Sequence, residues 1–196
     1  RAWEDVLALD YCLDETSWEQ PLLDRAVNEK PSRCVGFDGL APAAERLEAA
    51  FAKLEAAYPD LIRIGRTHLQ DATPLRFSQE VSGWRELVAA PCRMLRLAQT
   101  ELCRLAIGGT AVGTGLNAPK GYDEMVCGYL RQLTGLEFRP DENKFHALTS
   151  KDALVFAHGA LKALAANLMK IANDIRFEAS GPRCGLGEIN LPARQP

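Results

Sequence analysis

The spacing of apolar residues is most regular near the end of the chain, where it predicts a long helix. Apolar side chains recur there at alternating intervals of three and four residues, which is typical of a helix that packs against another helix. Thr149–Asp152 fits a capping box at the start, and Ser180-Gly181-Pro182 ends the run. This apolar seam consists of Leu154, Ala157, Leu161, Leu164, Leu168, Ile171 and Ile175.

The opposite side of this predicted helix is also rather apolar. It carries Val155, Phe156, Ala165, Ala166, Met169 and Ala172. A helix that is apolar on more than one face needs several neighbours. We therefore expect a large helical bundle or the core of an oligomer.

Three earlier segments also show helical spacing. They are residues 41–58, about 77–105 and about 122–133. Pro91 should kink or interrupt the second of them, because proline removes a helical hydrogen bond. Residues 60–75 lack clear periodicity and are expected to form a loop. Because convincing strand alternation is absent, we predict an all-α fold, with an irregular segment at 1–40 and a helical domain at 41–196.

Composition restricts the class of protein. The 196 residues are 47% hydrophobic and 25% charged, as in an ordinary soluble globular protein. Apolar runs fall short of the ~20 residues expected of a membrane helix. Basic clusters with interleaved aromatics, which would indicate nucleic acid, are also missing. We expect neither a membrane nor a nucleic acid as partner.

The six cysteines indicate free thiols in a reducing compartment, which favours the cytoplasm. They show neither a Cys-x-x-Cys pair nor metal-ligand spacing, so a structural zinc or an iron–sulfur cluster is not expected. They are Cys12, Cys34, Cys92, Cys103, Cys127 and Cys184.

A Gly/Thr-rich loop at 108–117 is the first candidate for chemistry. It contains Gly113-x-Gly115-x-x-Ala118, a nominal dinucleotide fingerprint. That fingerprint needs a preceding strand and a following helix, whereas here a helix precedes and Pro119 follows. We therefore expect a tight turn, or a loop whose N–H groups and hydroxyls line a polar pocket.

Polar residues also crowd the segment 65–74, where His68 lies among several hydrogen-bonding groups. A lone loop histidine is more often structural than catalytic, but its pKa near neutrality would suit a general base or acid. Thr67 beside it would donate to a substrate carboxylate.

The other two histidines lie in later segments. His158, in the middle of a helix, is expected in the core or in a hydrogen bond between helices, and His146 is expected at the surface or in a site. Arg183, in the Gly-rich run 180–189, would pair with a carboxylate or cap the preceding helix.

These segments together resemble class II fumarases of the fumarase/aspartase superfamily. The resemblance rests on the sequences at 65–75 and 108–117, and on 168–176 running into 180–189; it covers about residues 59–192. Aspartases usually carry Gln where this chain has His68, so fumarase is favoured over aspartase. The resemblance implies reversible addition of water to fumarate without a cofactor, in a homotetramer with a core of long helices. It also implies that each site collects loops from three subunits, with Thr67 contacting substrate and His68 helping to activate water.

The chain also departs from the family pattern. Its printed residues include neither the family's catalytic Gly-Ser-Ser loop nor the Gly-Lys-Val-Asn-Pro segment, and residues 1–40 do not resemble the family. We therefore expect a partial chain that supplies one of the three contributions to a site and is inactive alone. Two alternatives remain open: a non-catalytic relative that acts as an assembly or binding module, and an aspartase-like ammonia lyase.

Overall fold

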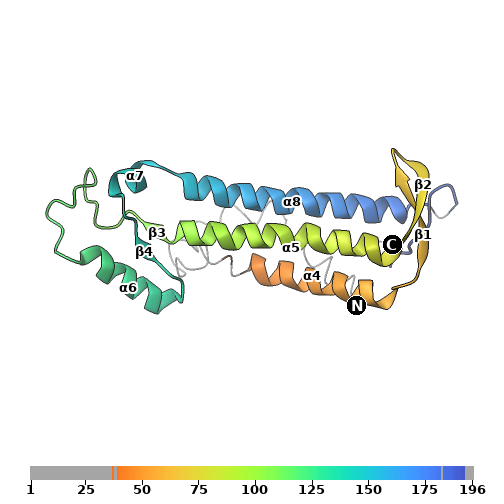
Figure 1. Cartoon of the computed structure of the whole chain (residues 1–196), viewed down its shortest axis with the longest axis horizontal. Coiled ribbons are helices and arrows are strands. Elements are labelled where there is room, and N and C mark those ends of the chain that lie inside the picture. Colours follow the sequence, from red (N-terminus) through yellow and green to blue (C-terminus); the bar gives the residue numbers. More distant parts are fainter. Residues whose placement is uncertain (1–36, 38, 182, 193–196) are drawn as a thin grey trace.

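Three long helices form the body of the protein, and the middle one runs antiparallel to the other two (Figure 1). The computed structural model describes residues 37, 39–181 and 183–192. The predicted segment 1–40 therefore lies almost wholly outside the described residues. The long helices are α4 (Leu40–Ala57), α5 (Phe77–Leu102) and α8 (Asp152–Glu178). The remaining elements are β1 (Ile62–Thr67), β2 (Gln70–Arg76), β3 (Arg104–Leu105), α6 (Tyr122–Thr134), β4 (Arg139–Pro140) and α7 (Lys144–Thr149).

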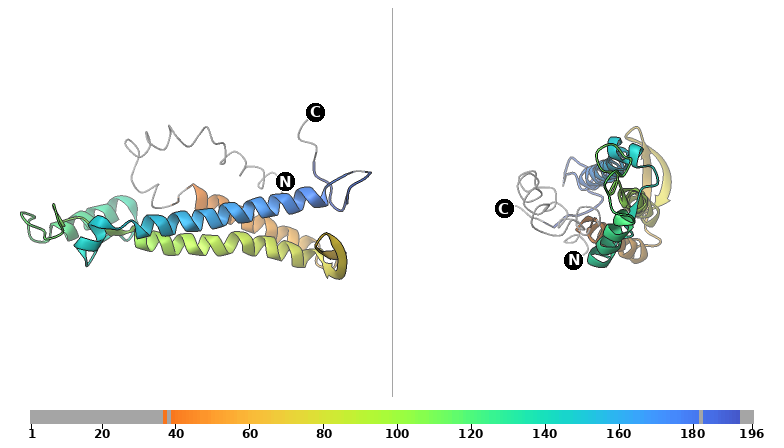
Figure 2. Two further views of the ribbon diagram at one scale, coloured as in Figure 1. Left: turned by 90° about the horizontal axis from the view of Figure 1, so that it is seen from above. Right: turned by 90° about the vertical axis from the view of Figure 1, so that its left-hand side faces the viewer.

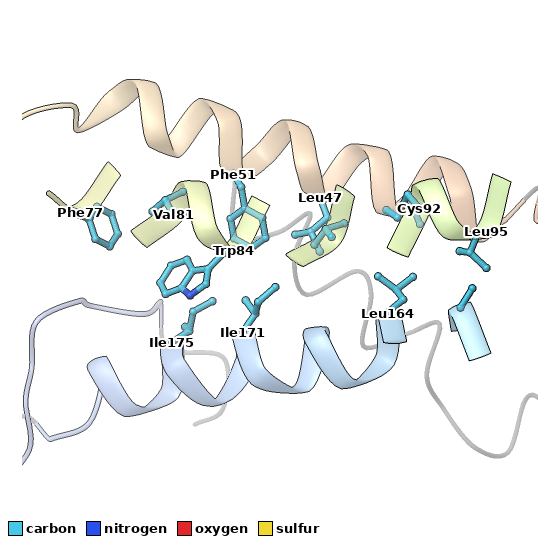
Figure 3. Packing of buried hydrophobic residues seen from close by; sticks show 14 residues of the cluster. Leu47, Phe51, Phe77, Val81, Trp84, Cys92, Leu95, Leu164, Ile171 and Ile175 are labelled. Carbon is cyan, nitrogen blue, oxygen red and sulfur yellow. The ribbon is translucent and has the colours of Figure 1, made fainter. Parts of the chain in front are cut away.

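The main core lies between the three long helices, with α5 in the middle (Figure 3). Trp84 of α5 is 1% exposed and contacts Phe51 of α4 and Phe77, with ring centroids 6.0 and 6.2 Å apart. Ile171 and Ile175 of α8 close the cluster from the other side. Aromatic side chains of this size contribute most of the apolar area that such a core buries.

The helical prediction is confirmed for all four segments, and the predicted seam of α8 faces the core. Ala157, Leu164, Ile171 and Ile175 are buried, while Leu161 and Leu168 are half-buried. Leu154, near the start of α8, is exposed. The expected capping box did not form: Thr149 belongs to α7, and Lys151 precedes α8 without a side-chain cap.

The second apolar side of α8 is exposed in the single chain. Val155, Phe156 and Met169 are 70%, 43% and 65% exposed. By length and composition alone α8 is apolar enough to cross a membrane, contrary to the expectation from its sequence, and 22% of its most apolar stretch is buried in the single chain. Its other face packs along α5 and carries polar contacts to it, so α8 is a bundle helix with a second apolar face that remains available.

Pro91 does not interrupt α5, which runs unbroken for 26 residues. Proline lacks the N–H that would bond to the carbonyl four residues earlier, here that of Leu87. The side chain of Asn167 on α8 donates to this Leu87 oxygen at 2.7 Å. The hydrogen bond missing from α5 is thus supplied by its neighbour, which explains why the predicted break is absent.

The prediction of a loop at 60–75 is wrong, because β1 and β2 form an antiparallel hairpin there. The hairpin lies where α4 ends and α5 begins, beside the end of α8 (Figure 1). A second cluster, of Cys103, Cys127 and Phe138, packs α6 at the opposite end. Of the four described cysteines, all free, only Cys184 is exposed.

Candidate functional site

The hairpin presents the predicted site residues at its turn. Thr67 pairs with Gln70, which leaves His68 and Leu69 as a two-residue connection. Both have positive φ, 52° and 63°, as in the mirror-image turns that match the twist of paired strands. Non-glycine residues adopt this region only at a cost of about 1 kcal/mol or more, and such strain is found often at functional sites. Thr67 and His68 are both exposed, so a partner or substrate can reach them.

A bulge below the turn depends on Gly65. The register shifts between Ile64 and Arg66, and the two strands approach closely there. A Cβ at Gly65 would lie 2.6 Å from a methyl carbon of Leu75 and 2.7 Å from the carbonyl oxygen of Thr73. Only glycine fits this approach, and the bulge turns Arg66 towards the helix ends.

Ion pairs fix the hairpin to the segment that follows α8. Glu188 accepts hydrogen bonds from Arg66 and, at 2.5 Å, from Nη2 of Arg63. The hydrogen bond from Arg66 lowers the pKa of Glu188, and the same contact raises the pKa of Arg66. Arg66 also lies 3.5 Å from Asp71 across the hairpin. Because Arg66 directly precedes Thr67, these contacts orient the turn.

The segment after α8 folds back on the end of that helix. The N–H of Gly187 donates to the Ser180 carbonyl at 2.8 Å, and the N–H of Glu188 donates to the Glu178 carbonyl at 2.9 Å. A Cβ at Gly185 would overlap the Ser180 carbonyl at 2.3 Å. The glycines of the sequence motif thus form the close turn that brings Glu188 to the two arginines. Arg183 and Cys184 lie exposed on this turn.

The structure does not bring the Gly/Thr loop at 108–117 to the hairpin. The loop lies at the opposite end of the molecule (Figures 1 and 2). The 26 residues of α5 separate the two ends by about 39 Å at 1.5 Å per residue. Phe145 and Lys144 pack against the loop, and a Cβ at Gly113 would lie 2.8 Å from the Phe145 ring. Lys144 pairs with Asp123 at 3.2 Å.

The other two histidines lie away from the hairpin. Nε2 of His146 is 2.9 Å from Asp152, at the start of α8. His158 is exposed on α8, so the expectation of a core histidine is wrong for the single chain. Across the described residues, acidic, cysteine and histidine side chains do not gather in a cluster suited to a metal ion.

A shallow hollow of about 310 Å³ lies at the base of the hairpin. It is lined mainly by apolar side chains, with Arg63 and Glu188 on its polar side. Thr67 and His68 do not line it. The turn and this hollow are therefore separate features.

The sequence profile of a family described as lyase matches residues 37–196. The chain belongs to the lyase family. This match reaches further towards the N-terminus than the motifs between residues 59 and 192.

Curated relatives that match this chain include class II fumarate hydratases. The chain is 53% identical over 159 residues to that of Oceanobacillus iheyensis and 52% identical over 160 residues to that of Bacillus subtilis. These matches cover 81% and 82% of this chain, but 34% and 35% of the relatives. The chain thus spans about a third of the length of the curated relatives it matches.

Solved structures of lyases agree with the fold. A class II fumarase of Schistosoma mansoni superposes with a TM-score of 0.77 at 39% identity, covering 80% of this chain and 36% of that one. A fumarate lyase:delta crystallin protein of Brucella melitensis gives a TM-score of 0.77 at 38% identity, covering 84% and 35%. The predicted resemblance and the helical fold are therefore confirmed.

Sequence reasoning missed the charged residues that anchor the hairpin. Arg63 contacts Glu80 and Glu178 as well as Glu188. The only signal in the sequence was acidic residues near the ends of two predicted helices. Their partners are far apart along the chain, so their meeting depends on the fold.

Proposed function

We propose that this chain is part of a fumarate hydratase that adds water reversibly to fumarate to give L-malate, the tricarboxylic acid cycle reaction, in the cytoplasm. The turn that presents Thr67 and His68 carries this proposal. The turn lies on a hairpin that ion pairs hold to the Glu188 segment. This part of the chain matches class II fumarate hydratases. The whole reaction is a proposal for the complete enzyme, of which the chain spans about a third.

Reversible hydration of fumarate requires a proton acceptor and groups that stabilise negative charge. Hydration adds the water oxygen to one alkene carbon and a proton to the other. In the reverse direction, removal of the C3 proton of malate builds negative charge on the adjacent carboxylate. His68 is the group that helps to activate the water, since imidazole exchanges protons near neutral pH. The Thr67 hydroxyl donates to a substrate carboxylate.

We also propose that the working enzyme is a homotetramer in which each site combines loops from three subunits. Two features support this. The hairpin and the Gly/Thr loop lie at opposite ends of one chain, about 39 Å apart along the 26 residues of α5. The exposed apolar face of α8 offers a surface on which helices of other subunits can pack. Residues 41–196 would form the helical part of such a subunit.

The test uses a chimera, because one chain alone gathers only part of a site. Residues 37–192 replace the matching segment of the Bacillus subtilis enzyme, and fumarate hydration is measured. We expect turnover that falls by about 100-fold or more in His68→Asn, the range for losing a general acid or base. Thr67→Val should raise KM more than it lowers kcat. Lys53→Gln, at an exposed position of α4 outside both loops, is the control and should stay active.

Three results would argue against the proposal. An active His68→Asn chimera would remove His68 from the mechanism. Ammonia release from aspartate without fumarate hydration would favour the aspartase-like alternative. A chimera that folds and assembles but catalyses neither reaction would favour the assembly module. The 196-residue chain by itself should show no turnover.

A further inference from the structure

Five charged side chains meet where the hairpin joins the helix ends. This charge cluster consists of Arg63 and Arg66 of β1, Glu80 of α5, Glu178 of α8 and Glu188 of the following segment. Arg63 is at its centre: Nη1 contacts Glu80 and, at 2.6 Å, Glu178, while Nη2 contacts Glu188 at 2.5 Å. One guanidinium therefore links four separate parts of the chain.

The cluster has more acidic than basic groups. Three carboxyl groups face two guanidinium groups, and Arg66 is also shared with Asp71 of β2. The next charges on α8 do not restore the balance, because Lys170 is paired with Asp174, whose charge also acts on Glu80. Burying an uncompensated carboxylate is costly, so a site with one surplus negative charge favours uptake of a proton.

Glu178 is a buried carboxyl group of the cluster, and one of its oxygens lacks a hydrogen-bond donor within the described part of the chain. Its side chain is only 4% exposed, and its Oε2 has no hydrogen-bond donor among the described residues when every carboxyl group is ionised. Glu80 contacts the same Arg63 nitrogen as Glu178, and a side-chain hydrogen bond with Glu178 is among the causes that raise the pKa of Glu80. Burial and the charge of Glu178 raise the pKa of Glu80 to about 7, against the opposing effect of Arg63.

We propose that Glu80, protonated where it faces Glu178 across Arg63, acts as a pH-sensitive latch that holds the hairpin and the Glu188 segment on the helix ends. When the proton is lost, two carboxylates repel each other beside Arg63. The contacts that Arg63 makes to the hairpin and to Glu188 then weaken. The inference does not depend on the proposed catalytic activity, because it concerns only how firmly the hairpin is held.

The raised pKa of Glu80 determines how the stability of the latch changes with pH. Glu80 titrates near 4.5 when unperturbed and near 7 in the folded chain. Its proton therefore favours the folded arrangement fully below about pH 4.5, and this contribution is lost as the pH rises to about 7. The latch should be closed in mildly acidic solution and loosened in mildly alkaline solution.

Backbone hydrogen exchange of the full 196-residue chain tests this. Exchange is measured by mass spectrometry at about pH 6 and about pH 8.5, with correction for the intrinsic effect of pH. We expect peptides from residues 62–76 and 183–192 to lose several-fold protection at the higher pH, while α4 changes little. Glu178→Gln should abolish this pH dependence. Glu80→Gln, which resembles the protonated form, should keep the hairpin protected at both values.

Glu86→Gln is the matched control, because Glu86 lies on the same helix in an exposed pair with Arg93. It should behave like the unmodified chain. Equal hairpin protection at both pH values, or an unchanged pH dependence in Glu178→Gln, would overturn the latch. If the variants fail to fold, infrared spectroscopy of the unmodified chain gives the answer. A protonated carboxyl band must be present at the lower pH and vanish at the higher one, and its absence at both would overturn the proposal.

Discussion

At the scale of single residues, the hairpin depends on backbone positions that few side chains can occupy. The strands come so close at the bulge that Gly65 has no room for a Cβ. The turn residues His68 and Leu69 adopt left-handed conformations. The close approach of the strands at Gly65 and the strained turn have different causes. Both fix the positions of Arg66, Thr67 and His68.

Substitution of Gly65 tests the first feature. We expect Gly65→Ala to lower the free energy of unfolding by about 1–3 kcal/mol, as for other overpacked sites, since one of the clashing atoms is a backbone oxygen. Urea unfolding gives the value. Gly83→Ala is the control: its Cβ would meet nothing within 4 Å on α5, so it should stabilise by about 0.5–1 kcal/mol. Equal effects of the two substitutions would show that the bulge tolerates a side chain.

At the scale of elements, helices were predictable where a periodic seam specified them. The spacing in α8 located the helix and its core face, because four of the seven seam residues are buried. The hairpin escaped prediction because most residues of β1 and β2 are exposed or half-buried, so the strands lack a buried face and the sequence lacks alternation. Similarly, Arg63 finds Glu80 and Glu188 at separations of 17 and 125 residues, beyond the reach of local patterns.

At Pro91, the rule that proline removes a helical hydrogen bond was right, but the expected break in the helix did not follow from it. The rule identifies a missing hydrogen bond at the Leu87 carbonyl, and the fold provides Asn167 to replace it. The sequence of α5 alone cannot reveal this, because the replacement donor lies 80 residues away on α8.

A double-mutant cycle tests this replacement. Asn167→Ala should destabilise the chain by about 1–3 kcal/mol, because the Leu87 carbonyl is left without its partner. In a Pro91→Ala background the loss should be smaller by about 1 kcal/mol, since the new N–H can bond to Leu87 within the helix. Asn173→Ala, at an exposed position of the same helix, serves as control and should change stability by less than about 0.5 kcal/mol. Additive effects in the cycle would contradict the replacement.

At the scale of the whole molecule, the long helices keep the candidate loops apart. The hairpin and the Gly/Thr loop lie at opposite ends of an elongated chain (Figure 2). A site that uses both must be built by different chains, and this requires a surface for assembly. The exposed apolar side of α8, with Val155, Phe156 and Met169 open to solvent, is the surface that we propose for this assembly.

Charge placed on this side should therefore prevent assembly. We expect the unmodified chain to form a tetramer in light scattering, at four times its subunit mass of 21.5 kDa. Val155→Lys combined with Met169→Lys should shift it to smaller species, because charges buried between apolar helices are strongly unfavourable. Lys53→Glu, an exposed charge change on α4, should leave the tetramer intact. Circular dichroism distinguishes dissociation from unfolding, since a dissociated chain keeps the helices that pack on α5. A double variant that remains tetrameric would exclude this face of α8 from the interface, and the subunits would have to meet elsewhere for the separated loops to share a site.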